Sequence, residues 1–249
     1  MVIDAHTHVD EIQSWGWLHP PEVLLPLLDK AGVHRAVVTT YRDACSPDDP
    51  ALAYLLEAIS KYPDRLWGYA RINAESPEAA ETLRHAMGHP GIRGVKLHTV
   101  SYVGFPYGSA TVQLMRQAAR YRAPVLFHSG DEPLALPLEL AEAARLCPET
   151  TVIMGHMGGY FHCHDALEVA EALPNVLLET SAMPYPDVIR RAVETIGGQR
   201  VLFGSDGPGC SPALEIEKVR LAGLSPADEA LVLGGNAQRV LEAVRHHAL

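Results

Sequence analysis

Short apolar runs rich in β-branched residues recur along the chain, each bounded by polar or turn-forming residues. Such runs are typical of strands that are buried on both faces of a parallel sheet. Eight of them start between 24 and 33 residues apart, which is the length of one strand–loop–helix unit. They cover residues 2–6, 35–40, 66–72, 92–98, 124–128, 151–156, 175–180 and 200–206.

The segments between these runs place apolar residues at helical spacing. Residues 20–32 carry Pro near the start and Gly at the end, and residues 49–62 and 76–88 open with Asp or Ser followed by Pro. These residues favour the first and last turns of helices. Further helices are predicted at residues 109–121, 136–147, 165–173, 187–198, 213–223, 225–235 and 236–247.

Eight alternating strand and helix units in 249 residues predict an α/β protein with a closed (β/α)8 TIM barrel. A doubly wound open sheet is the alternative. The first loop between strand and helix, at residues 8–19, lacks the G-x-G-x-x-G pattern of dinucleotide-binding sheets. No linker or low-complexity tract divides the chain, so we expect a single domain over residues 1–249.

Charge and composition narrow the range of partners. The chain is 47% hydrophobic and 20% charged, as in ordinary globular proteins. Lys and Arg number 20 against 30 Asp and Glu, a net charge of −10, and no basic stripe stands out. We therefore expect a small-molecule substrate rather than nucleic acid or a membrane surface, and the sequence leaves a homodimer open.

The cysteines and the first residues of the sequence indicate the cellular compartment of the protein. The four cysteines include no C-x-x-C pair and suggest no disulfide framework, so we expect reduced thiols. The first residues carry no basic segment followed by an apolar stretch, and no apolar run reaches about 18 residues. These features predict a cytoplasmic protein.

Histidines gather where the predicted strands end. In a (β/α)8 barrel the active site forms at the carboxyl ends of the strands. Histidines end four of the eight runs and a carboxylate ends the eighth: His6 and His8, His98, His128, His156, and Asp206.

This arrangement predicts a metal site. Alternate residues of a strand share one face, so His6 and His8 can bind one ion together. The eighth strand closes the barrel beside the first, which places Asp206 next to this pair, and His128 reaches the same ion from across the barrel. Three imidazoles and one carboxylate suit one divalent ion, zinc first, with manganese, iron, cobalt or nickel also suitable. Such an ion activates a bound water.

At this point the motifs carry a family resemblance. IDAHTH, GVKLH, VLFHSG, VIMGHMGG, LFGSD and LGGNAQRVL, in this order from residue 2 to about 240, resemble the amidohydrolase superfamily. More narrowly, they are similar to the branch that includes the aminocarboxymuconate-semialdehyde decarboxylase-like enzymes. The resemblance implies a divalent metal bound by His6, His8, His128 and Asp206. It also implies that His156 is a general acid/base or a second-metal ligand.

The resemblance leaves several activities open. We expect a hydrolase of a small amide, lactone or related substrate, in which Asp206 accepts a proton from water and His156 stabilises or protonates the oxyanion. A non-oxidative decarboxylase of an unsaturated or aromatic acid needs the same ligands. A barrel that binds metal or ligand without catalysis is an alternative of another class. A metal phosphoesterase of the polymerase-and-histidinol-phosphatase type, which also begins with H-x-H, is a further one.

Four residues are candidates for substrate contact. His98 ends the fourth strand at the expected mouth of the barrel, and Arg42 and Arg71 follow the second and third strands, where an arginine can bind a substrate carboxylate. Trp15, with its neighbour Trp17, lies in the first loop and could cover the pocket.

Two further features have a structural interpretation. Lys96 precedes His98 by two residues, and we expect it deeper in the barrel, paired with a carboxylate such as Asp4 or Glu179. Whether Lys96 is modified stays open. The His-Cys-His cluster at residues 162–164 has metal-binding spacing, but we expect the start of a helix there rather than a second metal site.

Overall fold

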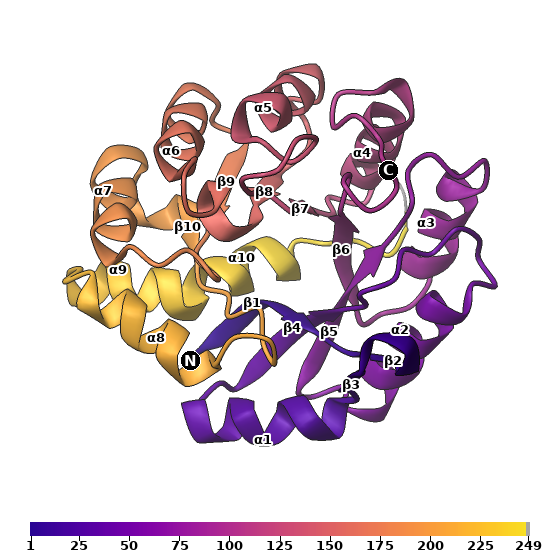
Figure 1. The fold of residues 1–249 in the computed structure, drawn as a ribbon, viewed down its shortest axis with the longest axis horizontal. Coiled ribbons are helices and arrows are strands. Elements are labelled where there is room, and N and C mark those ends of the chain that lie inside the picture. Colours follow the sequence, from indigo (N-terminus) through magenta and orange to yellow (C-terminus); the bar gives the residue numbers. More distant parts are fainter. Residues whose placement is uncertain (248–249) are drawn as a thin grey trace.

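The computed structural model describes residues 1–247, and eight parallel strands form a nearly closed barrel with helices around it (Figure 1). The strands follow one another around the barrel in chain order, so each strand–helix unit packs beside the previous one. The TIM-barrel prediction is confirmed. The barrel strands are β1 (Ile3–His8), β4 (Arg35–Thr39), β5 (Leu66–Arg71), β6 (Ile92–Leu97), β7 (Val125–Phe127), β8 (Val152–Met154), β9 (Val176–Glu179) and β10 (Val201–Leu202).

The first and last strands meet at the seam of the barrel. The amide of Ala5 donates to the carbonyl of Phe203 at 2.9 Å, and the amide of Asp206 donates to the carbonyl of His6 at 2.8 Å. Thr7 and Gly207 form an isolated parallel bridge. The seam therefore places the segment after β10 directly beside the end of β1.

The helices form where the sequence predicts them. Leu24 and Leu28 of the first helix lie one turn apart and are both buried against the barrel. The carboxylate of Asp49 caps the second helix by accepting from the amide of Ala51 at 2.9 Å. The helices are α1 (Pro21–Ala31), α2 (Pro50–Lys61), α3 (Ala79–Met87), α4 (Ser109–Arg120), α5 (Pro137–Leu146), α6 (Cys163–Ala172), α7 (Pro186–Ile196), α8 (Pro212–Leu221), α9 (Pro226–Ala230) and α10 (Asn236–Glu242).

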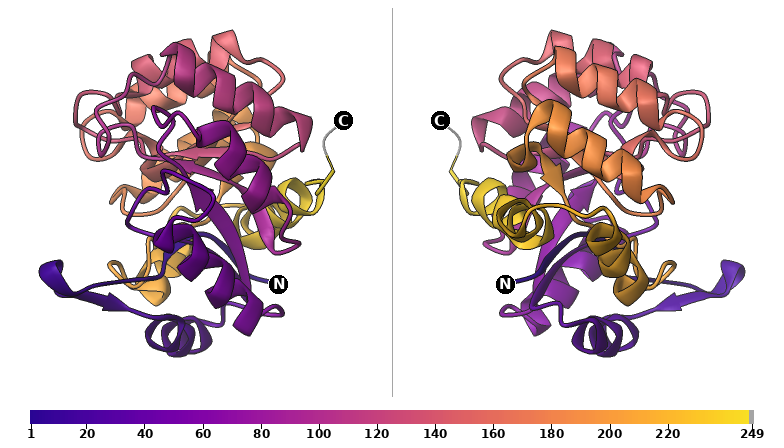
Figure 2. Two further views of the ribbon diagram at one scale, coloured as in Figure 1. Left: turned by 90° about the vertical axis from the view of Figure 1, so that its right-hand side faces the viewer. Right: turned by 90° about the vertical axis from the view of Figure 1, so that its left-hand side faces the viewer.

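The amino-terminal end of the barrel is filled by apolar side chains. Ile3, Trp67 and Leu126 belong to a buried cluster inside the barrel that also contains Val240 and Leu241 of α10. Figure 2 shows α10 on the side of the molecule opposite the hairpin described below. Because this end is closed by packed side chains, a site for substrate can form only at the other end, where the strands terminate.

The structure differs from the sequence prediction in the first loop. Residues 8–19 were expected to be loop, but they contain β2 (Asp10–Ile12) and β3 (Trp17–His19), which pair in antiparallel fashion. This hairpin projects from the body of the molecule (Figure 2). Its strands have three residues each, too few for a period-2 pattern to be visible in sequence. Within residues 1–247, every helix is too short or too polar to cross a membrane.

Candidate metal centre

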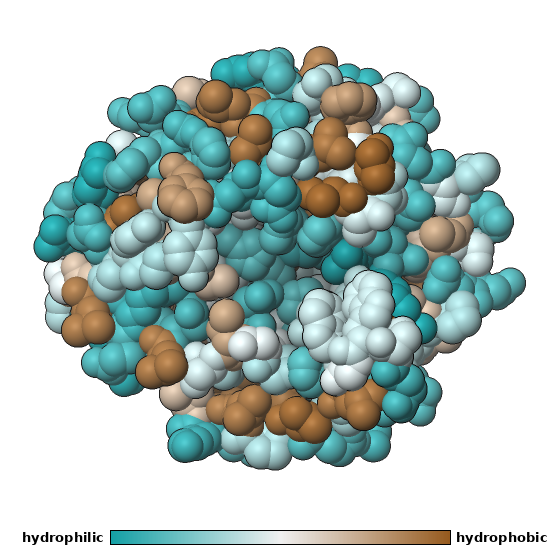
Figure 3. Space-filling view, in the orientation of Figure 1, coloured by the Kyte–Doolittle hydropathy of each residue, from teal (hydrophilic) through white to brown (hydrophobic). Residues whose placement is uncertain are grey.

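A cavity of about 300 Å³ lies at the carboxyl ends of the barrel strands. Seen from this side, the centre of the molecule is hydrophilic (Figure 3). The cavity brings together residues from seven of the eight barrel strands or their following loops, as the (β/α)8 architecture requires. It is lined by His8, Trp15, Trp17, Tyr41, Arg71, Lys96, His98, Ser101, His128, His156 and Asp206.

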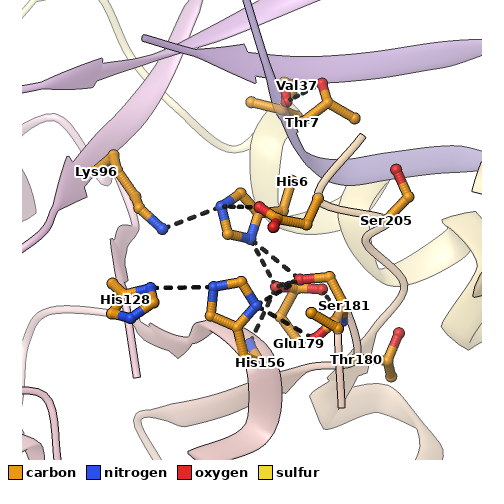
Figure 4. A network of polar contacts seen from close by, with 12 residues as sticks. His6, Thr7, Val37, Lys96, His128, His156, Glu179, Thr180, Ser181 and Ser205 are labelled. Atoms are coloured by element: carbon orange, nitrogen blue, oxygen red, sulfur yellow. Dashed lines mark hydrogen bonds and ion pairs between the residues drawn. The ribbon is translucent and has the colours of Figure 1, made fainter. Parts of the chain in front are cut away.

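His6 lies beneath this cavity, fully buried, and is held through both ring nitrogens. Its Nδ1 lies 2.9 Å from Oε2 of Glu179, and its Nε2 lies 3.0 Å from Nζ of Lys96 (Figure 4). Glu179 ends β9, and it also accepts from the backbone amide and the hydroxyl of Ser181. Because an ionised carboxylate only accepts, His6 carries its proton on Nδ1 and presents the Nε2 lone pair to the centre.

His156 faces His6 from the turn after β8. Its Nδ1 lies 3.0 Å from Oγ of Ser181, and its Nε2 lies 3.1 Å from Nδ1 of His128. His156 has φ of 61° and Met157 has φ of 45°, a left-handed backbone that is uncommon outside glycine. This turn lifts the imidazole over the end of the strand and into the cluster, and such strain is typical of functional sites.

Asp206 lies at the seam where the last strand of the barrel meets the first. Its Oδ1 lies 2.9 Å from Nε2 of His8 and 3.7 Å from Nε2 of His6. Burial alone would raise the pKa of Asp206, but the hydrogen bond from His8 and the nearby imidazoles hold that pKa well below its usual range. Asp206 is therefore ionised at neutral pH.

His8 is held by stacking as well as by Asp206. Its ring lies flat on that of Tyr41, with centroids 4.4 Å apart and an interplanar angle of 5°. Its buried Nδ1 has no hydrogen-bond partner among the described residues. Nε2 is therefore the ring nitrogen that His8 directs toward Asp206 and the cluster.

The donor atoms fit a divalent metal ion. Among residues 1–247, one group of three ligating side chains has donor atoms that all lie within 4.8 Å of one another: His6, His156 and Asp206. The structure places His8 beside Asp206 and His128 beside His156, at the two edges of this group. Neutral imidazoles and a carboxylate are the ligands that zinc and other first-row ions prefer.

The protonation states support the same conclusion. Burial lowers the pKa of each of His6, His8 and His128, and it lowers the pKa of His156 to about 4. These imidazoles are therefore neutral at pH 7 and retain a lone pair. Metal ligands must be deprotonated in this way before an ion can bind.

Lys96 does not pair with the carboxylates that the sequence suggested. Its Nζ contacts His6 instead, because Asp4 accepts from the backbone amides of Ser205 and His6 and Glu179 is occupied by Ser181 and His6. Lys96 is 1% exposed, and burial lowers its pKa to about 7. Near neutral pH its amine is therefore only partly protonated, unlike that of an exposed lysine.

The remaining sequence candidates are distributed around the mouth. Arg71 lines the cavity and its Nε donates to Asp43 at 2.8 Å, whereas Arg42 forms a salt bridge with Asp10 and lies outside the cavity lining. Arg42 was expected to follow a strand into the mouth, but the carboxylate of Asp10 holds its guanidinium elsewhere. His98 lines the cavity and stacks on His128, with ring centroids 4.3 Å apart.

Two tryptophans of the hairpin border the cavity. Trp15 packs edge-on against Trp17, and Trp17 packs against Tyr41 at 4.5 Å. Trp15 is 60% exposed, so much of its ring is available for contact. The expectation that the first loop covers the pocket therefore has a structural basis in this aromatic edge.

Residues 162–164 form the start of a helix. α6 begins at Cys163, which is buried, and His162 is hydrogen-bonded to Asp165 at 2.7 Å. His164 lies 3.4 Å from Arg191 on α7. The two histidines have separate partners and the cysteine is buried, in keeping with the structural interpretation.

Several site residues escaped the sequence analysis. Glu132 lies 2.9 Å from Nε2 of His128, and Ser181 contacts His156. Tyr41 stacks on His8. Glu132 lies in a loop beyond the strand end, and serine and tyrosine carry no motif here, so nothing in the sequence pattern singled them out.

A larger groove, of about 550 Å³, lies between α3 and α4, and its lining includes alanine, glutamine and arginine side chains.

A barrel with histidines and a carboxylate converging at the strand ends defines a metal-dependent α/β-barrel enzyme. The family model described as Amidohydrolase matches residues 3–243. The chain therefore belongs to the amidohydrolase family, as its ordered motifs predicted. No curated protein matches the chain by sequence.

Solved structures share the fold at low sequence identity. A dihydroxybenzoic acid decarboxylase from a Polaromonas species, with bound manganese and 2-nitroresorcinol, has a TM-score of 0.73, 19% identity, and coverage of 97% of this chain and 96% of that chain. A probable 2-pyrone-4,6-dicarboxylic acid hydrolase from Acinetobacter baumannii has a TM-score of 0.72 and 17% identity, with coverage of 97% of this chain and 99% of that chain. An amidohydrolase from Burkholderia multivorans with bound zinc has a TM-score of 0.76 and 18% identity, with coverage of 97% of this chain and 99% of that chain.

Proposed function

We propose that this protein is a metal-dependent hydrolase of a small molecule with an amide, lactone or related bond. The observation that carries the proposal is the convergence of His6, His156 and Asp206 within 4.8 Å, with His8 against Asp206 and His128 against His156 at its edges. In the proposed centre His6, His8, His128 and Asp206 hold one divalent ion, and zinc is the ion that we favour. Such an ion supplies Lewis acidity, which polarises a carbonyl and lowers the pKa of water.

The protein groups handle the protons. Asp206 is ionised and accepts the proton of the attacking water at a carboxylate oxygen. His156 directs Nε2 toward the cluster, where that atom holds or passes a proton as the oxyanion develops. Ser181 fixes the ring of His156 through Nδ1. Tyr41 keeps His8 in the plane that meets Asp206.

The cavity suits a small, planar, anionic substrate. Its volume of about 300 Å³ is at the lower end of the range for small-molecule pockets. Trp15, Trp17 and Tyr41 form an aromatic edge that can pack against a ring. Arg71, which is paired with Asp43, and the protonated form of Lys96 line the cavity wall, where they favour a carboxylate on the substrate.

Decarboxylation of an unsaturated or aromatic acid is the second candidate. Lys96 favours it, because a cation buried next to the centre is suited to hold a substrate carboxylate. The Polaromonas neighbour is a dihydroxybenzoic acid decarboxylase, and the Acinetobacter neighbour is a hydrolase of a dicarboxylic acid. Both reactions use the same proposed ligands, so the substrate decides between them.

We also propose a cytoplasmic location, which the four free thiols support.

The test is a substrate screen on protein loaded with one metal at a time. Lactones, amides and hydroxybenzoic acids are supplied, and the products are analysed for released acid or for released carbon dioxide. Acid release from lactones or amides supports hydrolysis, and carbon dioxide release supports the second candidate. We expect His156→Asn to lower kcat by about 10²- to 10⁴-fold. Equal turnover by the wild type and this variant would remove His156 from the mechanism.

The matched control is Glu171→Ala, a change at an exposed residue of α6 far from the cavity lining. It should leave turnover at the wild-type value. Trp15→Ala should raise KM about tenfold with little change in kcat, because it removes packing on the substrate and not a reacting group. A fall in kcat with unchanged KM would place Trp15 outside the substrate contact.

A further inference from the structure

Three of the four histidines at the centre share one arrangement, and His8 is the exception. Each directs one ring nitrogen into the cluster and the other toward an oxygen acceptor behind it (Figure 4 shows two of these pairs). The outer pairs are His6 Nδ1 with Glu179 Oε2 at 2.9 Å, His156 Nδ1 with Ser181 Oγ at 3.0 Å, and His128 Nε2 with Glu132 Oε1 at 2.9 Å.

Glu132 differs from the other two acceptors in its place in the fold. Glu179 and Ser181 are buried at the end of β9, whereas Glu132 lies in the loop between β7 and α5 and its side chain is 43% exposed. It is outside the set of residues that line the cavity. Glu132 therefore contacts His128 from outside the set of residues that line the cavity.

The loop is built to present this carboxylate. The amide of Gly130 donates to the carbonyl of Ala135 at 3.1 Å, and the amide of Ala135 donates to the carbonyl of Glu132 at 3.1 Å. A Cβ atom on Gly130 would lie 2.7 Å from Oε2 of Glu132 and 3.4 Å from Nε2 of His128. Glycine at position 130 thus leaves the carboxylate free to approach the imidazole, whereas a larger residue would have to shift the end of the Glu132 side chain.

The hydrogen bond decides which nitrogen of His128 carries the proton. An ionised carboxylate only accepts, so Nε2 must be the protonated nitrogen of a neutral His128. The lone pair is then on Nδ1, which lies 3.1 Å from Nε2 of His156 and faces the cluster. With the opposite tautomer, Nδ1 would present a hydrogen to the centre and could not bind an ion.

We propose that Glu132 is a positioning residue that fixes His128 as the Nε2-protonated tautomer and so makes Nδ1 a metal ligand. The inference rests on the metal site proposed above. Carboxylates behind ligating histidines orient the ring and strengthen the ligand in metal sites generally. Here the acceptor comes from an exposed loop, which makes the metal affinity depend on a residue outside the barrel and the cavity.

The first experiment measures the tautomer in metal-free protein. Histidine ring ¹⁵N NMR at pH 7.5 distinguishes the two protonated nitrogens, and His128→Asn assigns the signals. We expect His128 to be protonated on Nε2 in the wild type and in Glu132→Gln, whose amide oxygen still accepts. Glu132→Ala should lose this preference. An Nδ1-protonated His128 in the wild type, or the same spectrum for wild type and Glu132→Ala, would overturn the inference.

The second experiment measures zinc affinity by competition with a chromophoric chelator. Loss of a partner behind a ligating histidine costs 10- to 100-fold in affinity, so Glu132→Ala should bind zinc weaker by about this factor, with Glu132→Gln between it and the wild type. Glu142→Ala, at a glutamate of α5 that pairs with Arg145, is the control and should match the wild type.

The two proposals fail in different ways. A wild type that binds no zinc contradicts the metal-dependent function, while the tautomer measurement still decides the role of Glu132. A wild type that binds zinc as tightly as Glu132→Ala contradicts the role of Glu132 and leaves the metal site intact.

Discussion

The Nε2 atom of His8 lies 2.9 Å from Oδ1 of Asp206, although the two residues are 198 positions apart in the chain. The contact crosses the seam of the barrel, where the backbone of Asp206 is also bonded to that of His6. Three of the four proposed metal ligands therefore come together only when the last strand docks beside the first. The centre is therefore complete only in the closed barrel.

We predict that Asp206→Asn lowers kcat/KM by at least about 100-fold and reduces the bound metal per chain. The amide cannot accept the proton of the attacking water and is a weaker ligand than a carboxylate. Metal content by mass spectrometry and steady-state kinetics check both effects. Asp187→Asn, at an exposed residue of α7, is the control. Full metal content and full activity in Asp206→Asn would contradict both assigned roles.

We predict that Glu179→Ala lowers the free energy of unfolding of the metal-free protein by at least about 2 kcal/mol. Glu179 is fully buried and accepts from His6 and from the amide and hydroxyl of Ser181, so its removal leaves several buried donors without an acceptor. Urea denaturation measures the change, with Glu171→Ala as the exposed control. Equal stability of the two variants would show that the buried donors find other acceptors.

Lys96→Met should change stability and binding in opposite directions. Burial lowers the pKa of Lys96 to about 7, which means that folding places its cation in an unfavourable environment. An apolar side chain of similar length should raise the free energy of unfolding by about 1–4 kcal/mol. The same change should weaken the binding of carboxylate substrates, seen as a higher KM. A variant that is less stable than the wild type would argue that Lys96 supports the fold.

The metal-free protein should lose stability as the pH falls from 6.5 toward 4. Burial lowers the pKa of His156 from 6.5 to about 4, so in this window the unfolded chain binds more protons at this residue than the folded chain does. Stability therefore rises with pH here, and His156 alone accounts for about 3 kcal/mol. Urea denaturation at several pH values checks the slope.

His156→Asn should flatten this slope, and His85→Asn, at an exposed histidine of α3, should leave it unchanged. A slope of the same size in the wild type and in His156→Asn would show that other groups carry the acid sensitivity.

The fold was accessible from the sequence because its signal repeats. Eight apolar runs at regular spacing, each followed by a helical segment, leave few arrangements besides a barrel, and the structure has all eight strands in chain order. Their predicted ends were close enough to place His128 and His156 at the mouth. The β2–β3 hairpin was missed, because two strands of three residues leave no periodic signal.

The sequence by itself determined the barrel, the family, and the residue types that gather at its mouth, because periodicity and strand ends depend only on local chemistry. Only the tertiary structure decided which partner each polar side chain takes. Arg42 pairs with Asp10 outside the cavity, and Lys96 contacts His6 in place of a carboxylate. The physical reason is competition: several donors and acceptors lie within reach once the chain is folded. Distance, burial and space, which no local pattern encodes, select among them.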